Sequence, residues 1–394
     1  MSAPVFFISL VLGIHIVAVN IGIALATIIP FLKRKADMTR NEDLDSAAYS
    51  LFRIYAGTYA LAGVMGTAFT VFLLSFYPEF IGVAGNIALI PFGISIISIL
   101  LHFFAIVTYW YGWNNFSPRL HHAAGWLLMI TAYTIPLGFR AVFAFLNTPS
   151  GLILGEKPML DIVQALLNPT FLPLYLKSIV GAITAGFLFV AGVLAFKALK
   201  SGQNEVERDI YTSSLRYASI GLFAMMFLGP WYTLALVNVP VKFNNIFSSL
   251  GASLQAPTLS NYSWLFLLKM ILVILQGILL IRLLIPAGKD HFYDTPSGHK
   301  ASISAAVLAA LTILTGEYLN AFSQYPFFIA NVPLIADKLP EPYRTILGRA
   351  LNMENISPLA QDPLLYIVTS IGVLLLLSAA AYMIYFILIK KEGQ

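Results

Sequence analysis

Nine long apolar runs constrain this chain more than any other feature of its sequence. A run of about eighteen or more apolar residues is long enough to cross a bilayer as a helix. Of the 394 residues, 59% are hydrophobic and 10% are charged, whereas a soluble domain has about a quarter charged. We place the runs at 5–32, 54–77, 83–111, 122–146, 170–196, 213–238, 262–286, 302–330 and 364–389. The sequence therefore predicts an all-α, polytopic bundle of about nine transmembrane helices, with residues 1–394 forming a single membrane domain.

Lysine and arginine gather between alternate runs, which predicts the orientation of the chain. Residues 33–53, 197–212 and 287–301 carry basic clusters, so the positive-inside rule makes them cytoplasmic loops. Residues 147–169 and 331–363 then become outer-face loops, with the N-terminus outside and the C-terminus in the cytoplasm. A basic cytoplasmic fringe is ordinary for a multi-pass protein of a prokaryotic plasma membrane, and it does not indicate a nucleic acid partner.

The chain contains no cysteine. This excludes thiolate-held iron–sulfur clusters, covalent c-type haem and disulfides within the chain. Any redox cofactor would be held by histidine, methionine, lysine or carboxylate, or would belong to a partner.

One histidine, His15, lies deep in the first run, which contains no charged residue. A titratable imidazole in hydrocarbon is costly, so it is by default a functional-site hypothesis. The open alternatives are a ligand to a metal or haem, a proton carrier and a packed polar contact.

Three cations from three runs fall in one layer of the outer half. At a rise of about 1.5 Å per residue, Arg140, Lys177 and Lys269 each lie roughly 10 Å below the outer end of a run. Glu317, placed roughly 20 Å below that face, is the carboxylate well inside a run. Three cations exceed one anion, so either they snorkel to the surface or a bound anion, such as a haem propionate, compensates them.

A second group of histidines lies near the inner ends of the third and fourth runs. His102 and His121, with His122 beside them, could form a proton path together with Glu317, or one could ligate a metal or haem. Interfacial hydrogen bonding is the alternative. The estimated depths of His15 and His102 differ by about 10 Å, which argues against one iron held between them.

Several short motifs in the first five runs recur in one known family. They are Gly13-Ile14-His15 and Gly22-Ile23-Ala24; Gly63-Val64-Met65-Gly66-Thr67; Gly112-Trp113 followed by His121 and Trp126; and Leu167-Asn168-Pro169 followed by Tyr175 to Gly186 and Phe189-Val190-Ala191-Gly192. With them the chain resembles subunit I of cytochrome bd, the membrane terminal oxidase. The resemblance covers about the first 220 residues and continues more weakly to the eighth run.

The resemblance implies which positions would hold haem. His15 falls on the family's ligand to a high-spin haem, and Lys177 falls on the histidine of the low-spin haem. The methionine of the seventh helix falls on Leu267, with Met270 three residues later.

The family's acidic positions are changed. The third-helix acid near the oxygen-reducing haem falls on Ile94, and the proton-channel acid falls on His102. The eighth-helix acid falls near Ala321, with Glu317 one turn earlier. The large hydrophilic loop in which the family oxidises quinol is reduced to residues 239–261.

The resemblance therefore implies a divergent subunit of a respiratory electron-transfer complex that binds haem b through His15. Arg140, Lys177, Lys269 and Met270 are the further candidate cofactor contacts. The haem number, a haem d, a bound quinone and the catalytic residues stay open, and the short loop argues against a usual quinol oxidase. A second membrane subunit and further respiratory subunits are the expected partners.

Two other functions remain open. The first is a haem-free scaffold that binds quinone or lipid within a larger respiratory assembly. The second is a proton or ion carrier that uses Glu317, Lys269 and the His102 group.

Overall fold

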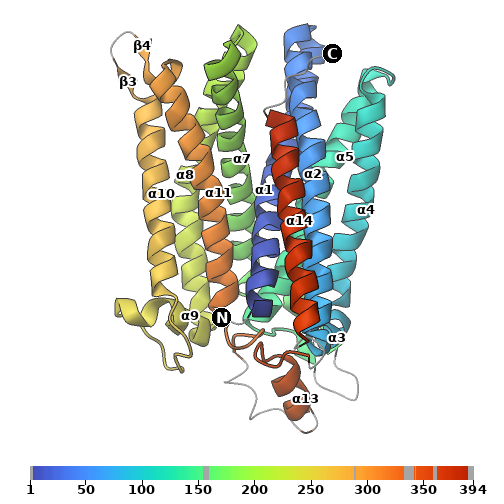
Figure 1. Ribbon diagram of the computed structural model, residues 1–394, viewed down its shortest axis with the longest axis vertical. Helices are drawn as coiled ribbons and strands as arrows, with labels where there is room; N and C mark the ends of the chain where they lie inside the picture. The colour runs from blue at the N-terminus through green and yellow to red at the C-terminus, as the bar shows by residue number, and fades with distance from the viewer. Residues whose placement is uncertain are drawn as a thin grey trace.

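Long helices that stand side by side make up most of the molecule (Figure 1). The computed structural model describes residues 3–153, 159–287, 290–331, 341, 343–357 and 362–388. Within these residues, nine helices are long and apolar enough to cross a membrane, which confirms the predicted fold class. They are α1 (Ala3–Thr39), α2 (Glu42–Phe76), α4 (Leu89–Gly112), α5 (Pro118–Asn147), α7 (Phe171–Ser201), α8 (Glu205–Ala235), α10 (Ser263–Leu284), α11 (Pro296–Phe322) and α14 (Pro363–Leu388).

Short elements lie at the two ends of the bundle. Figure 1 shows α3 (Pro78–Ile87), α9 (Pro240–Phe247) and α13 (Tyr343–Ala350) at the end that carries the N-terminus, here called the lower end. At the opposite, upper end, β3 (Pro286–Ala287) pairs antiparallel with β4 (Asp290–His291). The 3₁₀ turns are η1 (Leu236–Asn238), η2 (Ser248–Leu250) and η3 (Phe292–Asp294).

The two predicted outer-face loops have different outcomes. Residues 147–169 contain the antiparallel pair β1 (Leu152–Ile153) and β2 (Met159–Leu160), followed by the short helix α6 (Ile162–Leu166). The other loop, 331–363, contains α13, and its residues 332–340, 342 and 358–361 lie outside the described part of the chain.

Several helices continue beyond the apolar runs. α1 ends at Thr39 and α2 begins at Glu42, so most of the expected loop 33–53 is helical. Likewise, α7 and α8 take up most of 197–212, and Asn204 and Glu207 form a capping box between them. Hydropathy marks only the apolar part of a helix. A polar segment outside the bilayer can also be helical when a capping side chain satisfies the free backbone groups at its end. Which end of the bundle faces the cytoplasm remains a prediction.

Helix ends also correct one predicted depth. The run 302–330 is helical only to Phe322, where α11 ends. Glu317 is therefore about 8 Å from the end of its helix, not 20 Å, and it shares a layer with Arg140 of α5. The run 83–111 is likewise divided, because α3 ends at Ile87 and α4 begins at Leu89.

α1 packs against α2, α5, α7 and α11, so it lies at the centre of the helix contacts. Small residues permit its closest approach: a side chain at Gly186 of α7 would overlap that of Ala24. Close approach of small residues is a main source of helix association in a bilayer, where lipid is as apolar as the core. His15 is thus carried by a central helix that packs against four other membrane helices.

Candidate functional site

His15 lies between α1 and α2 in a cradle that leaves one ring nitrogen available. Its Nδ1 lies 2.8 Å from the carbonyl oxygen of Ala62, and because a carbonyl only accepts, Nδ1 carries the proton. A side chain at Gly66 would place its Cβ 2.8 Å from the His15 ring. Metal-bound histidines characteristically donate their second nitrogen to such a carbonyl. His15 has the chemistry of a residue that would hold haem iron through Nε2.

The four candidate residues of the lower end lie around α11. Arg140 and Glu317 form a bidentate ion pair, with N–O distances of 2.7 and 3.2 Å. Only 7% of the Arg140 side chain and 19% of the Glu317 side chain are exposed. The one carboxylate therefore pairs with Arg140, and the predicted excess of cations over anions in this layer concerns the two lysines.

Lys177 and Lys269 lie beside this pair. Lys177 Nζ lies 3.9 Å from the centroid of the Tyr232 ring and interacts electrostatically with Lys269, Glu317 and Arg140. Lys269 Nζ lies 3.2 Å from where a Cβ at Gly316 would be, directly before Glu317. Within the described part of the chain, neither amino group has a hydrogen-bond acceptor.

The structure adds Lys242 of α9, which the sequence analysis missed. Lys242 is fully buried, and its Nζ donates to Asn147 Oδ1 at 2.7 Å and to the carbonyl and side-chain oxygens of Asn320 at 2.8 Å. The Tyr232 hydroxyl donates to the same Asn320 side chain at 2.8 Å. Burial lowers the pKa of Lys242 to about 7, against the raising effect of Glu317. A lone lysine in a short polar segment carries no hydropathy signal, so the sequence could not identify it.

Two buried asparagines hold the segment that carries Lys242. Asn245 accepts hydrogen bonds from the backbone of Leu259 and Ser260 and donates to the carbonyl of Ser323 at 3.0 Å. Asn244 binds the backbone of Leu254 in both directions. Residues 239–261 are thus held as a cap over the end of α11.

His102 belongs to a separate, neutral network near the middle of α2, α4 and α5. The Thr131 hydroxyl donates to the Leu127 carbonyl at 2.7 Å, so His102 Nδ1, 2.6 Å away, donates to Thr131 Oγ1. The other nitrogen, Nε2, then accepts a short hydrogen bond from the Tyr55 hydroxyl. His102 is 2% exposed and has both nitrogens satisfied.

His121 and His122 have partners of their own. His121 Nε2 lies 3.0 Å from the Tyr109 carbonyl and its ring stacks on Tyr109, while its buried Nδ1 has no hydrogen-bond partner among the described residues. His122 pairs with Asp37 at 2.9 Å. The structure therefore does not join the three predicted proton-path residues: Arg140, the partner of Glu317, is about 14 Å along α5 from Thr131, the partner of His102.

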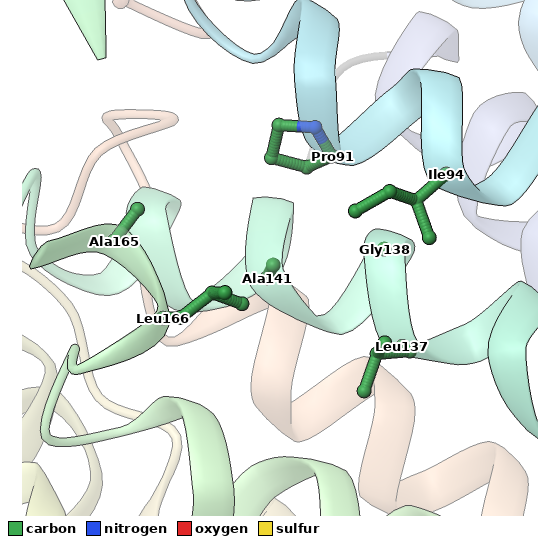
Figure 2. A pocket seen from close by; sticks show the side chains of 7 residues that line it. All are labelled: Pro91, Ile94, Leu137, Gly138, Ala141, Ala165 and Leu166. Atoms are coloured by element: carbon green, nitrogen blue, oxygen red, sulfur yellow. The ribbon is translucent and has the colours of Figure 1, made fainter. Parts of the chain in front are cut away.

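Two other positions that the resemblance relates to haem, 94 and 267, carry aliphatic side chains. Ile94 lines a small apolar cavity (Figure 2), and Leu267 is 47% exposed on the outer side of α10. Met270 is half-buried next to Lys269. The cavity is lined by Pro91, Ile94, Leu137, Gly138, Ala141, Ala165 and Leu166. With position 267 pointing outward and Lys177 placed among cations, this donor set does not fit a second haem between α7 and α10.

Comparison of the sequence with known families gives one match over most of the chain. The family described as "Cytochrome bd terminal oxidase subunit I" matches residues 6–246. This range contains His15, Lys177 and Lys242.

Individual relatives agree with the family match. The chain is 23% identical over 219 residues to "Putative cytochrome bd menaquinol oxidase subunit I" of Bacillus subtilis (strain 168), covering 55% of this chain and 49% of the relative. It is 28% identical over 122 residues to "Cytochrome bd ubiquinol oxidase subunit 1" of the same organism, covering 30% and 25%. The chain thus matches half or less of the length of these relatives.

A solved structure shows the same fold. The bd oxidase from Geobacillus thermodenitrificans superposes with a TM-score of 0.77 at 17% identity, covering 96% of this chain and 97% of that chain. The chain therefore has the helix arrangement of that structure.

Proposed function

Because the chain belongs to the cytochrome bd terminal oxidase subunit I family, we propose that it binds haem b through His15 as part of a respiratory electron-transfer complex. Its nine membrane helices within the described residues and its family make it a multi-pass protein of the plasma membrane. The name "subunit I" is that of one component of a multi-subunit oxidase.

The observation that carries this proposal is the state of the His15 ring. The Ala62 carbonyl fixes the tautomer and the orientation of the imidazole, so the lone pair of Nε2 is kept for iron. Gly66 keeps α2 close to the ring without a side chain that would displace it. Bound haem would supply one-electron redox chemistry. The protein would contribute a neutral, pre-oriented ligand and an apolar environment, both of which tune that chemistry.

The ordered cap at 239–261 supports a partner as the source of electrons. The segment where the family oxidises quinol is here only long enough for α9, η2 and a short return to α10. Its polar side chains are used to hold the cap on α11. We therefore assign electron delivery to a second membrane subunit.

A haem-free scaffold is the second candidate function, and one observation favours it. Where the family has an acid and a methionine, this chain has Ile94 and Leu267, whose aliphatic side chains can bind neither a proton nor iron. If His15 is only a packed polar contact, the bundle would serve to support a catalytic partner and to bind lipid or quinone.

The reduced-minus-oxidised visible spectrum with pyridine-haemochrome quantification separates the two functions. We expect a b-type spectrum from protein isolated with its native partners, and a loss of about one haem per chain in His15→Ala. Gly66→Ala keeps the histidine but presses a methyl group against its ring, so it should lower haem occupancy as well. His291→Ala changes an exposed histidine at the upper end and is the matched control.

Two results would contradict haem ligation by His15. One is a well-folded wild-type complex whose haem content is fully accounted for by the partner subunits. The other is an unchanged spectrum in both His15→Ala and Gly66→Ala. Either result would favour the scaffold function.

A further inference from the structure

Arg140, Lys177, Lys269 and Glu317, here called the lower cluster, hold more positive than negative charge within the part of the chain that the structure describes. Arg140, Lys177 and Lys269 are three cations within membrane-spanning helices, and Glu317 is one carboxylate, which leaves a formal charge of +2. The bidentate pair with Arg140 already occupies both carboxylate oxygens of Glu317. Lys242 is satisfied separately by Asn147 and Asn320. The remaining donors are the amino groups of Lys177 and Lys269.

These two amino groups point into the bundle and do not snorkel. Lys177 Nζ lies over the ring of Tyr232, a side chain that is only 7% exposed. Lys269 Nζ lies against Gly316 in the middle of the cluster. A charged group in the membrane interior is costly unless it is paired. The expectation of snorkelling therefore does not account for their positions, whereas a bound anion would.

The surroundings of Lys269 indicate an anion that carries an apolar tail. Leu267, Leu268 and Ile271 are 47%, 41% and 55% exposed on the outer side of α10, where lipid would lie. A free inorganic anion would lose its hydration to reach this layer, while an amphiphile brings its charge in together with apolar chains. Ammonium groups form short, charge-assisted hydrogen bonds with phosphate oxygens.

We propose that Lys177 and Lys269 bind the phosphate of an anionic membrane phospholipid whose acyl chains lie along the exposed side of α10. One phosphodiester charge would reduce the formal excess among these four groups from +2 to +1. The Arg140–Glu317 pair would remain in place and orient the two lysines around it. This site is independent of haem at His15.

The test is lipid binding by the delipidated full-length protein in a neutral detergent. Native mass spectrometry would count bound phosphatidylglycerol, with phosphatidylcholine and inorganic phosphate as comparison probes. We expect one phosphatidylglycerol to be retained preferentially. Lys177→Gln with Lys269→Gln should bind it about tenfold to a hundredfold more weakly, because two charge-assisted hydrogen bonds are lost. Lys300→Gln, an exposed lysine at the opposite end of α11, should bind like the wild type.

Lys177→Arg with Lys269→Arg keeps the charge and should retain binding, which separates recognition from misfolding. Equal binding of phosphatidylglycerol by wild type and the Gln variants would overturn the proposal. So would saturation by inorganic phosphate that excludes the lipid, since the site would then take a free anion. Loss of haem from the Gln variants with unchanged lipid binding would also overturn it, in favour of a haem carboxylate at these lysines.

Discussion

The lower cluster and the His102 network bury polar groups in the same bundle in opposite ways. In the His102 network every donor has an acceptor, and no group needs to be charged. The lower cluster holds ionised side chains, and two of its amino groups are left over. A closed neutral network stabilises the fold without help, whereas an incomplete charged cluster depends on what binds to it. The second arrangement is therefore the better indication of a binding site.

The largest loss of stability is expected when the one carboxylate of the lower cluster is removed. Glu317→Gln leaves the buried Arg140 without a counter-charge among several cations, and breaking such a pair costs about 3–5 kcal/mol. We expect a large fall in the thermal unfolding midpoint and in the denaturant midpoint.

The matched control removes both charges. Arg140→Leu combined with Glu317→Leu should recover most of the lost stability, because replacing a whole buried pair is often nearly neutral. A Glu317→Gln protein as stable as wild type would show that the pair is not needed, and the contrast between the two regions would fail.

A smaller effect should come from the pH dependence of the lower cluster. Burial lowers the pKa of Lys242 to about 7, so the folded protein binds fewer protons than the unfolded chain between that pH and the usual range of lysine. Stability from this group is then greatest at high pH and is lost as the pH falls towards 7. Between about pH 7 and about pH 9.5 we expect a gain of roughly 3 kcal/mol in unfolding free energy.

Lys242→Met should remove this pH slope, even if it lowers stability at every pH by leaving Asn147 and Asn320 with fewer donors. The measurement is the thermal midpoint of wild type and variant across the same pH range. A slope that is equal in both proteins would mean that Lys242 stays charged in the folded state, held by its three acceptors.

The neutral network predicts a more modest loss. Tyr55→Phe removes the hydroxyl that donates to His102 Nε2 and leaves one buried acceptor unsatisfied, which costs about 1–3 kcal/mol. Tyr59→Phe is the matched control, because its ring lies 5.1 Å from that of His102 while its hydroxyl has no hydrogen bond within the described residues. Chemical denaturation of both variants decides the point: equal losses would show that ring packing, not the hydrogen bond, holds the network.

The apolar runs predicted the number of membrane helices well but not where the helices end. The error at Glu317 shows why this matters, since extending its helix to residue 330 separated it from Arg140 by about 10 Å in depth. Lys242 was missed for a related reason: it lies outside every run and is buried only because Asn244 and Asn245 fold its segment inward. His15 was identified from its cost in hydrocarbon, whereas the Ala62 carbonyl that orients it is a backbone group that no sequence pattern marks.

An exposed ion pair at the upper end supplies the baseline for the whole comparison. Arg208 binds Asp294 through two hydrogen bonds of 2.8 Å, as good a geometry as the Arg140–Glu317 pair, but its side chains are 55% and 31% exposed. Solvent screening should hold the cost of Asp294→Asn below about 1 kcal/mol. The hydrogen bond from Arg208 lowers the pKa of Asp294, so this small contribution is present at neutral pH and is lost as the pH falls through and below the usual range of aspartate. If Asp294→Asn destabilised the protein as much as Glu317→Gln, burial would not explain the difference between the two ends. A loss of unfolding free energy several-fold smaller than that of Glu317→Gln would show that burial decides the contribution of a bidentate ion pair. The same geometry then stabilises the protein strongly only where the bilayer and the neighbouring lysines would leave an unpaired charge without solvent.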